Sequence, residues 1–164
     1  MIIDANVFKG FYQAELGTMH MLCGCPSSLF NKATAANPIF HDSGGIIESE
    51  WVAVVDREWF EPWLANQLIA GLIAYTEQKK DAGLERNLVN LGFPGGRDFV
   101  YIRTGLGIIS TNKSHCRFFT EDLDFYDPTK KGCPAKTRNS ILRSSAGPVA
   151  KLLKKRKILV ECVP

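Results

Sequence analysis

Four carboxylates stand within the short stretch 121–127, and they follow a run of apolar and β-favouring residues that ends at Thr120. The run, residues 116–120, predicts a buried strand. Because ligands of open α/β sheets bind at the carboxyl ends of the strands, acid at this position predicts a binding site. A solvated acidic turn explains the same stretch equally well when it is taken alone.

Further acids stand at other junctions between predicted elements. Asp4 follows the short apolar run Ile2-Ile3, and Asp98 precedes a predicted helix. Glu48 and Glu50 lie on another predicted helix, which begins near residue 46. Strands that alternate with helices favour parallel pairing with right-handed crossovers, and this places successive strand ends on one edge of the sheet. The sequence therefore predicts that acids far apart in the chain meet there.

Several carboxylates at close range raise one another's pKa, so they persist where cations neutralise them. Ligation by oxygen alone favours Mg²⁺ or Mn²⁺ over zinc. Such a metal lowers the pKa of a bound water and polarises a phosphoryl oxygen, which indicates a phosphodiester substrate. For Asp98 a second interpretation stays open, because a carboxylate at the start of a helix also serves as a cap.

The same residues resemble a known family, the PIN domains, which are metal-dependent ribonucleases and include toxins of toxin–antitoxin pairs. The segment IIDANVF at residues 2–8 is similar to the family's opening strand with its Asp-x-Asn signature, and TEDLDF at 120–125 is similar to its late motif. Asp98 matches the family's third acid. The resemblance covers roughly residues 1–127 in ordered pieces.

The resemblance implies a site made of acids from four parts of the chain. Glu50 is the first choice for the glutamate and Glu48 the second, since two residues along a helix turn the side chain by roughly 200°. Asp124 is either a ligand or structural, whereas Glu121 and Asp127 are left as a solvated turn. The implied catalytic and metal-binding residues are Asp4, Glu50, Asp98 and Asp122, supported by Asn6 and Thr120.

The implied function is that of a Mg²⁺- or Mn²⁺-dependent endoribonuclease that hydrolyses RNA with metal-activated water. A toxin of this kind implies an antitoxin partner, and the resemblance also implies a homodimer. The alternative is a non-catalytic module on the same fold that binds RNA or a protein partner. A phosphatase with Asp4 as nucleophile is disfavoured, because its usual partner acid two residues on is Asn6 here.

Charge is distributed unevenly along the 164 residues. Residues 1–125 hold 10 Lys+Arg against 15 Asp+Glu, whereas residues 126–164 hold 10 against 2. A basic segment beside an acidic body favours a nucleic-acid partner, although a solvated lysine face explains it too. The candidate nucleic-acid-binding residues are Lys151, Lys154, Lys155, Arg156 and Lys157.

Length and pattern predict one domain over residues 1–164, an α/β protein with a central, mostly parallel sheet. The resemblance implies that this domain is a three-layer α/β/α PIN-like sandwich. Residues 128–164 are expected to form a basic C-terminal helix and a closing strand. A buried helix is expected over about 61–79, and further helices near 5–16, 84–91 and 99–109.

No signal peptide or apolar membrane-spanning run is recognisable, so a cytoplasmic protein without membrane contact is expected. The five cysteines match neither a zinc pattern nor the Cys-x-x-Cys motif, which predicts reduced thiols. The three histidines are dispersed and predict no metal site. These residues are Cys23, Cys25, Cys116, Cys133, Cys162, His20, His41 and His115.

Overall fold

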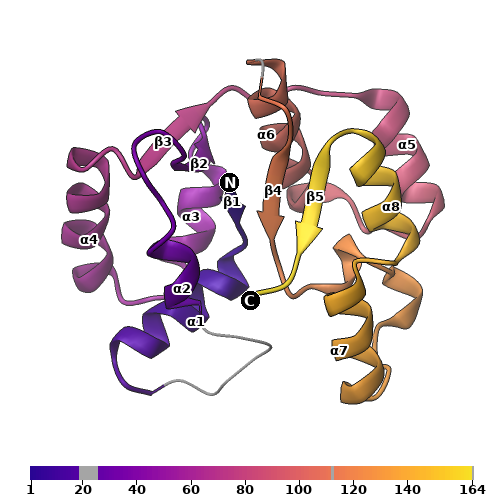
Figure 1. The fold of residues 1–164 in the computed structure, drawn as a ribbon, viewed down its shortest axis with the longest axis horizontal. Helices are drawn as coiled ribbons and strands as arrows, with labels where there is room; N and C mark the ends of the chain where they lie inside the picture. Colours follow the sequence, from indigo (N-terminus) through magenta and orange to yellow (C-terminus); the bar gives the residue numbers. More distant parts are fainter. Residues whose placement is uncertain (19–25, 112, 164) are drawn as a thin grey trace.

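Strands and helices alternate along most of the chain, which is described by a computed structural model covering residues 1–18, 26–111 and 113–163 (Figure 1). The α/β class and the parallel pairing predicted from the sequence are confirmed. His20, Cys23 and Cys25, for which the sequence predicted no metal site and reduced thiols, lie outside the described residues. The strands are β1 (Ile2–Ile3), β2 (Ile39–Asp42), β3 (Ile73–Thr76), β4 (Cys116–Phe119) and β5 (Ile158–Glu161).

The strands form two short parallel sheets that lie side by side. One has the order β1-β4-β5, with Ile3 opposite Phe119, and the other pairs β2 with β3. The amide of Phe40 donates to the carbonyl of Met1 at 2.8 Å, so β2 lies next to β1. The overall strand order is β3-β2-β1-β4-β5. From β1 the chain adds β2 and β3 on one side and then β4 and β5 on the other, so the strand order reverses between β1 and β4. A ligand crevice is expected beyond the carboxyl ends of two strands at such a reversal.

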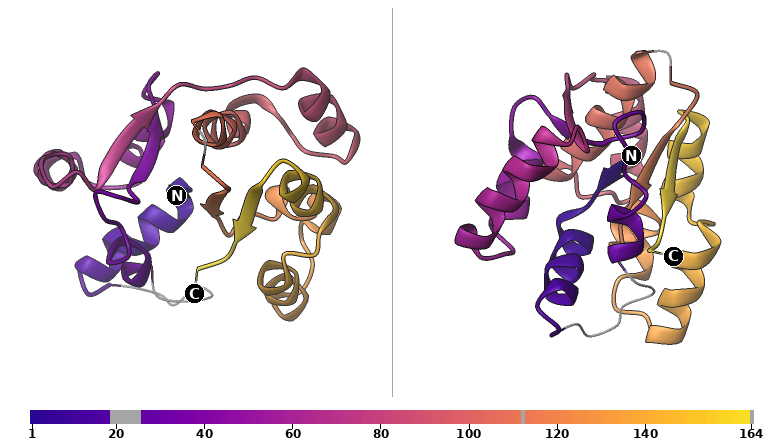
Figure 2. Two further views of the ribbon diagram at one scale, coloured as in Figure 1. Left: turned by 45° about the horizontal axis from the view of Figure 1, so that its top comes forward. Right: turned by 60° about the vertical axis from the view of Figure 1, so that its left-hand side comes forward.

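Helices cover both faces of the strands, as Figure 2 shows, which gives the three-layer arrangement expected from the sequence. Short 3-10 turns at Gly96–Asp98, Leu123–Phe125 and Pro128–Lys130 connect some of the elements. The helices are α1 (Ala5–Glu15), α2 (Ser27–Phe30), α3 (Ile46–Val52), α4 (Arg57–Ile69), α5 (Ala82–Asn90), α6 (Phe99–Ser110), α7 (Ala135–Ser144) and α8 (Pro148–Lys155).

Aromatic side chains fix α1 and α3 against β1. The rings of Phe8 and Trp51 stack with centroids 3.9 Å apart, and both side chains are fully buried. The indole nitrogen of Trp51 donates to the carbonyl of Ile3 at 3.1 Å. Aromatic stacking of this kind adds about 0.5–1.5 kcal/mol beyond the burial of area. The start of α1 and the middle of α3 are thereby held beside the end of β1.

Two glycines allow α6 to pack closely on its neighbours. A Cβ at Gly105 would lie 3.1 Å from Ile158 of β5, and one at Gly107 would lie 2.0 Å from the carbonyl oxygen of Glu77. Each glycine costs a helix about 1 kcal/mol relative to Ala. The close contacts explain why α6 contains both glycines. They also fix the position of the helix and therefore of Asp98, which immediately precedes it.

The predicted helix over about 61–79 is wrong in its second half. Helix α4 ends at Ile69, and Gly71 has φ +69°, a left-handed conformation that terminates the helix. The segment Ile73–Thr76 pairs in parallel with β2 as β3. Only Phe60 and Leu64 of α4 are buried, so this helix is also not the best-buried element.

The basic region 128–164 contains two helices rather than the one expected. Helix α7 was not predicted, because Ala135–Ser144 carries few apolar side chains and buries only Leu142, so its apolar spacing is weak. Among the other expectations, Cys116 and Cys133 form no disulfide. Within the described residues no helix combines the length and the apolar composition needed to cross a membrane.

Because of His41 in β2, we expect the free energy of unfolding to fall at acid pH. Its side chain is fully buried with its ring 4.4 Å from that of Trp51, and neither ring nitrogen has a hydrogen-bond partner among the described residues. Burial lowers the pKa of His41 from 6.5 to about 4. The unfolded chain therefore takes up this proton first, and folding loses up to about 3 kcal/mol as the pH falls from 6.5 to 4.

Urea unfolding at several pH values tests this expectation. His41→Leu should remove this part of the loss of stability at acid pH, whereas His115→Leu, at an exposed position, should leave the pH profile as it is in the parent protein. Identical profiles for the parent and His41→Leu would show that His41 does not govern acid stability.

Candidate functional site

Asp4 connects the end of β1 to the end of β4. Its amide donates to the carbonyl of Phe119 at 2.9 Å, and its carboxylate accepts from the Thr120 hydroxyl at 2.5 Å. It also caps α1 by accepting from the amide of Asn6 at 3.5 Å. Burial raises the pKa of Asp4 to about 6, which the two hydrogen bonds oppose and the charges of Asp122 and Glu50 reinforce. An acid with this pKa gains from a nearby cation.

Thr120 and Asp122 continue the site from the end of β4. The Thr120 hydroxyl accepts from the amide of Asp122 at 3.0 Å while it donates to Asp4, so it orients both acids. Asp122 in turn caps the turn Leu123–Phe125 by accepting from the amide of Asp124 at 2.9 Å. Thr120 is fully buried, so its hydroxyl acts as a positioning group.

The two candidate glutamates of α3 lie in different surroundings. Glu50 lines the pocket that Asp4 and Asp122 also line, and it accepts a hydrogen bond from the Tyr101 hydroxyl at 2.5 Å. Glu48 instead accepts from the Tyr75 hydroxyl at 2.6 Å. The helical turn of roughly 200° between the two positions accounts for this separation.

Asp98 makes no side-chain capping hydrogen bond to α6, although it immediately precedes the helix. Burial raises the pKa of Asp98 to about 6, and the charges of Asp122, Asp124 and Glu50 act in the same direction. Capping therefore does not account for this carboxylate, which is half-buried and faces other acids.

One pocket of about 290 Å³ collects the four acids Asp4, Glu50, Asp98 and Asp122. They come from the end of β1, from α3, from the start of α6 and from the end of β4. The pocket thus lies where the strand order reverses, at the edge predicted for ligand binding. The remaining lining residues are Ala5, Asn6, Ser49, Ala53, Val54, Arg97, Tyr101 and Phe125.

Asp124, the other possible ligand, has a protein partner. It is 3% exposed and accepts from the Lys131 ammonium at 2.5 Å. This hydrogen bond to Asp124 raises the pKa of Lys131, and the charges of Asp122 and Asp98 raise it further. The structure therefore favours a structural role for Asp124, which holds a cation beside the acids.

The expected solvated turn holds only in part. Asp127 accepts from the amide of Thr129 and caps a short turn, in agreement with that expectation. Glu121 is only 4% exposed, and a guanidinium nitrogen of Arg138 lies 3.7 Å from its carboxylate. The solvated-turn interpretation of Glu121 is therefore wrong, because α7, which the sequence did not predict, supplies the cation that pairs with it.

Oxygen is the only donor type that these four acids supply, as Mg²⁺ and Mn²⁺ prefer. Within residues 1–18, 26–111 and 113–163, no three His, Cys, Asp or Glu side chains stand close enough together to hold a metal ion as they are. A cation in this pocket would therefore draw the carboxylates inward.

Comparison of the chain with protein-family models, curated proteins and solved structures finds no match. The resemblance to PIN domains rests on the residue motifs quoted above. A functional interpretation therefore depends on the chemistry of the pocket itself.

The candidate nucleic-acid-binding residues lie away from the acid pocket. Lys155, Arg156 and Lys157 line a separate cleft next to the start of β5, at the opposite edge of the sheet. Lys154 lines another hollow, beside Leu159 and Glu161, and Lys151 is exposed on α8. The structure divides the basic tail among these places.

Tyr101 and Arg97 belong to the pocket but were not identified from the sequence. Tyr101 lies on the apolar face of α6, so its position in the sequence indicates a core residue. Its ring is buried, and its hydroxyl is the group that contacts Glu50. Arg97 stands in a glycine-rich loop, where composition predicts no role. The position of Tyr101 three residues after Asp98, about one helical turn, was the available signal.

Tyr101→Phe should weaken Mn²⁺ binding about tenfold, because outer-shell partners of metal ligands typically contribute 10–100-fold in affinity. The variant loses only the hydroxyl that orients Glu50. Titration of Mn²⁺ by calorimetry measures the effect. Tyr75→Phe is the matched control, since it removes the tyrosine hydroxyl that donates to Glu48. A weaker affinity in the control alone would assign the metal to Glu48.

Proposed function

We propose that the chain is a Mg²⁺- or Mn²⁺-dependent endoribonuclease with a PIN-like fold. The observation that carries the proposal is the meeting of four carboxylates from separate chain segments in one pocket at the reversal of strand order. Two of them, Asp4 and Asp98, have a raised pKa of about 6 and form no salt bridge among the described residues, although the charge of Lys131 partly opposes the rise at Asp98. Both features support a site that receives a cation.

Asp4, Glu50, Asp98 and Asp122 would hold the metal. When bound, Mg²⁺ or Mn²⁺ would lower the pKa of a water and neutralise charge that develops on the phosphodiester. Thr120 fixes the orientation of Asp4 and Asp122, and Tyr101 fixes that of Glu50. Arg97 is exposed at the pocket and is suited to pair with a phosphate oxygen of the substrate.

Incubation of the purified protein with a covalently closed circular RNA tests the proposal. Cleavage of a circle requires an internal cut, so linear product in Mn²⁺ and none in excess chelator is the expected result. A circle that stays intact in Mn²⁺ and in Mg²⁺, across RNAs of different structure, would overturn it. A homodimer and an antitoxin partner are further proposals from the motif resemblance, and a cytoplasmic location is a further proposal from the sequence pattern.

A non-catalytic RNA-binding module is the second candidate. It is favoured by the separation of the carboxylates, no three of which stand together as a metal site within the described residues. RNA binding that depends on salt, without metal-dependent cleavage and without Mn²⁺ binding, would support this candidate over the first.

A further inference from the structure

A cleft of about 320 Å³ lies at the sheet edge opposite the acid pocket. Cations from two distant parts of the chain surround it, and Leu106 and Ile109 of α6 supply apolar contacts. The cations are Lys79, Lys80, Lys155, Arg156 and Lys157.

An ion pair builds this cleft but leaves most of its charge uncompensated. Arg156 donates to Asp81 at 3.0 Å, which joins the turn after α8 to the start of α5. Asp81 also caps α5 by accepting from the amide of Leu84. This hydrogen bond and, after it, the pairing with Arg156 lower the pKa of Asp81. The four lysines form no ion pair within the described part of the chain, and all four are exposed. Asp81 lines the cleft and the charge of Lys80 acts on Glu85, so two acids offset part of the positive charge; the remaining excess of cations favours an anionic ligand.

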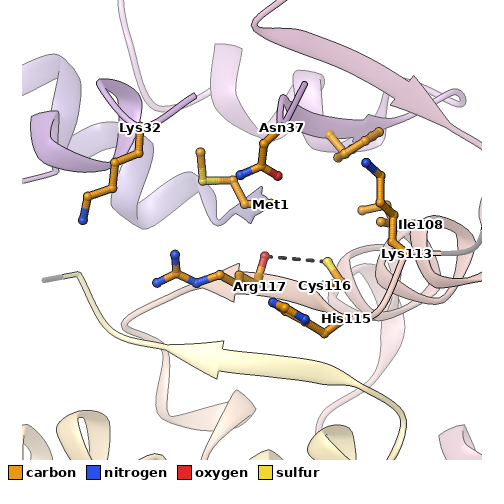
Figure 3. A pocket seen from close by; sticks show the side chains of 9 residues that line it. Met1, Lys32, Asn37, Ile108, Lys113, His115, Cys116 and Arg117 are labelled. Carbon is orange, nitrogen blue, oxygen red and sulfur yellow. Dashed lines mark hydrogen bonds between the residues drawn. The ribbon is translucent and has the colours of Figure 1, made fainter. Parts of the chain in front are cut away.

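A second, smaller hollow of about 100 Å³ lies around the start of β4 and is also lined by cations (Figure 3). Figure 3 shows Lys32 and Lys113 on opposite sides of it, with His115 and Arg117 nearby. Arg117 is paired with Glu161 at 2.6 Å, whereas Lys32 and Lys113 form no ion pair within the described residues. The amide of Cys116 donates to the carbonyl of Lys157 at 2.9 Å, which places the two hollows next to each other.

We propose that these two hollows form a docking surface for the phosphates of RNA, which we call the basic edge: Lys32, Lys79, Lys80, Lys113, Lys155 and Lys157. Six lysines along adjoining hollows fit a chain of phosphates better than a single phosphorylated molecule, which would use only one hollow. Lysine contacts to phosphates supply affinity without sequence choice. The identity of the ligand as RNA rests on the proposed ribonuclease function.

The basic edge and the acid pocket lie at the two ends of α6. Asp98 precedes this helix of 12 residues and Ser110, its last residue, lines the cleft. At 1.5 Å per residue the helix separates the two sites by about 18 Å. At roughly 3.4 Å per nucleotide of a stacked strand, about five nucleotides span this distance. The basic edge would therefore hold substrate at a distance from the cut.

Binding measured in chelator, where no cleavage occurs, tests the inference apart from the proposed activity. Fluorescence anisotropy of a single-stranded RNA of about 20 nucleotides gives the dissociation constant at several salt concentrations. The variant to compare with the parent protein is Lys79→Gln/Lys80→Gln/Lys155→Gln. The matched control, with three exposed cations changed outside both hollows and outside the acid pocket, is Arg86→Gln/Lys136→Gln/Arg143→Gln.

The slope of log affinity against log salt should fall by about 2 in the cleft variant, since each single-strand phosphate contact contributes about 0.7. The control should keep the slope of the parent protein. Equal slopes in the cleft variant and the control would overturn the basic edge, even if the protein cuts RNA. Conversely, loss of slope in the cleft variant of a protein that never cuts RNA would support the basic edge and count against the ribonuclease.

Discussion

Replacement of Asp122 by Asn should reduce Mn²⁺-dependent RNA cleavage by at least about a hundredfold, as loss of a charge-stabilising group in an active site typically does. Asn keeps the oxygen that caps the turn Leu123–Phe125, so the local structure is preserved. The lost property is the negative charge beside Asp4 and Asp98. Initial rates on a labelled RNA at saturating Mn²⁺ measure the effect.

Asp127→Asn is the matched control, since Asp127 stands in the same acidic stretch and also caps a short turn. It should cleave RNA at the parental rate. Equal activity of Asp122→Asn and Asp127→Asn would remove Asp122 from the reaction and leave the acidic stretch as a set of turn caps.

Replacement of Asp4 by Asn should stabilise the metal-free protein by about 3 kcal/mol at neutral pH. Burial raises the pKa of Asp4 from 3.8 to about 6 in the folded state, and each pKa unit corresponds to about 1.4 kcal/mol. The folded protein therefore retains this proton after the unfolded chain has lost it. Parent stability from this group is highest below pH 3.8 and is lost as the pH rises through 6.

The gain from Asp4→Asn should accordingly be full above pH 6 and vanish near pH 4, as urea unfolding in chelator would show. Asn remains a good helix cap, so α1 should be unaffected. Asp56→Asn, which changes an exposed cap of α4, should give no comparable gain. Saturating Mn²⁺ should reverse the order of stability, because only the carboxylate gains from the ion. A loss of stability in chelator at pH 7 would contradict the assigned cost of this charge.

Local patterns were sufficient for much of the fold and the site. Short apolar runs followed by acid marked β1 and β4, and the helical spacing after Asp98 marked α6 despite its two glycines. The parallel pairing of these strands then followed from the alternation of strands and helices. Asp4, Asp98 and Asp122 were therefore expected in one place, and they line one pocket.

Features that depend on distant contacts were not predictable. The apolar spacing of α4 continues into Ile73–Thr76, and only pairing with β2 makes that segment a strand. The choice between Glu50 and Glu48 is explained by two tyrosines from other elements, Tyr101 and Tyr75. Composition identified the basic tail as a unit, but the place of its helix α8 opposite the acids follows from the direction of α8 and β5, whereas Lys131 of the same tail pairs with Asp124 beside the acids.

The most direct test of the central claim is a crystal of the protein soaked in Mn²⁺ and examined by anomalous diffraction. One or two anomalous peaks should lie in the pocket, with oxygens of Asp4, Asp98 and Asp122 roughly 2.1–2.2 Å from the ion, as in other oxygen-ligated sites of small divalent cations. Glu50 should reach the same ion or its waters. A fully soaked crystal with no peak among these carboxylates, or with its peak at a different group of acids, would contradict a metal-dependent active site here.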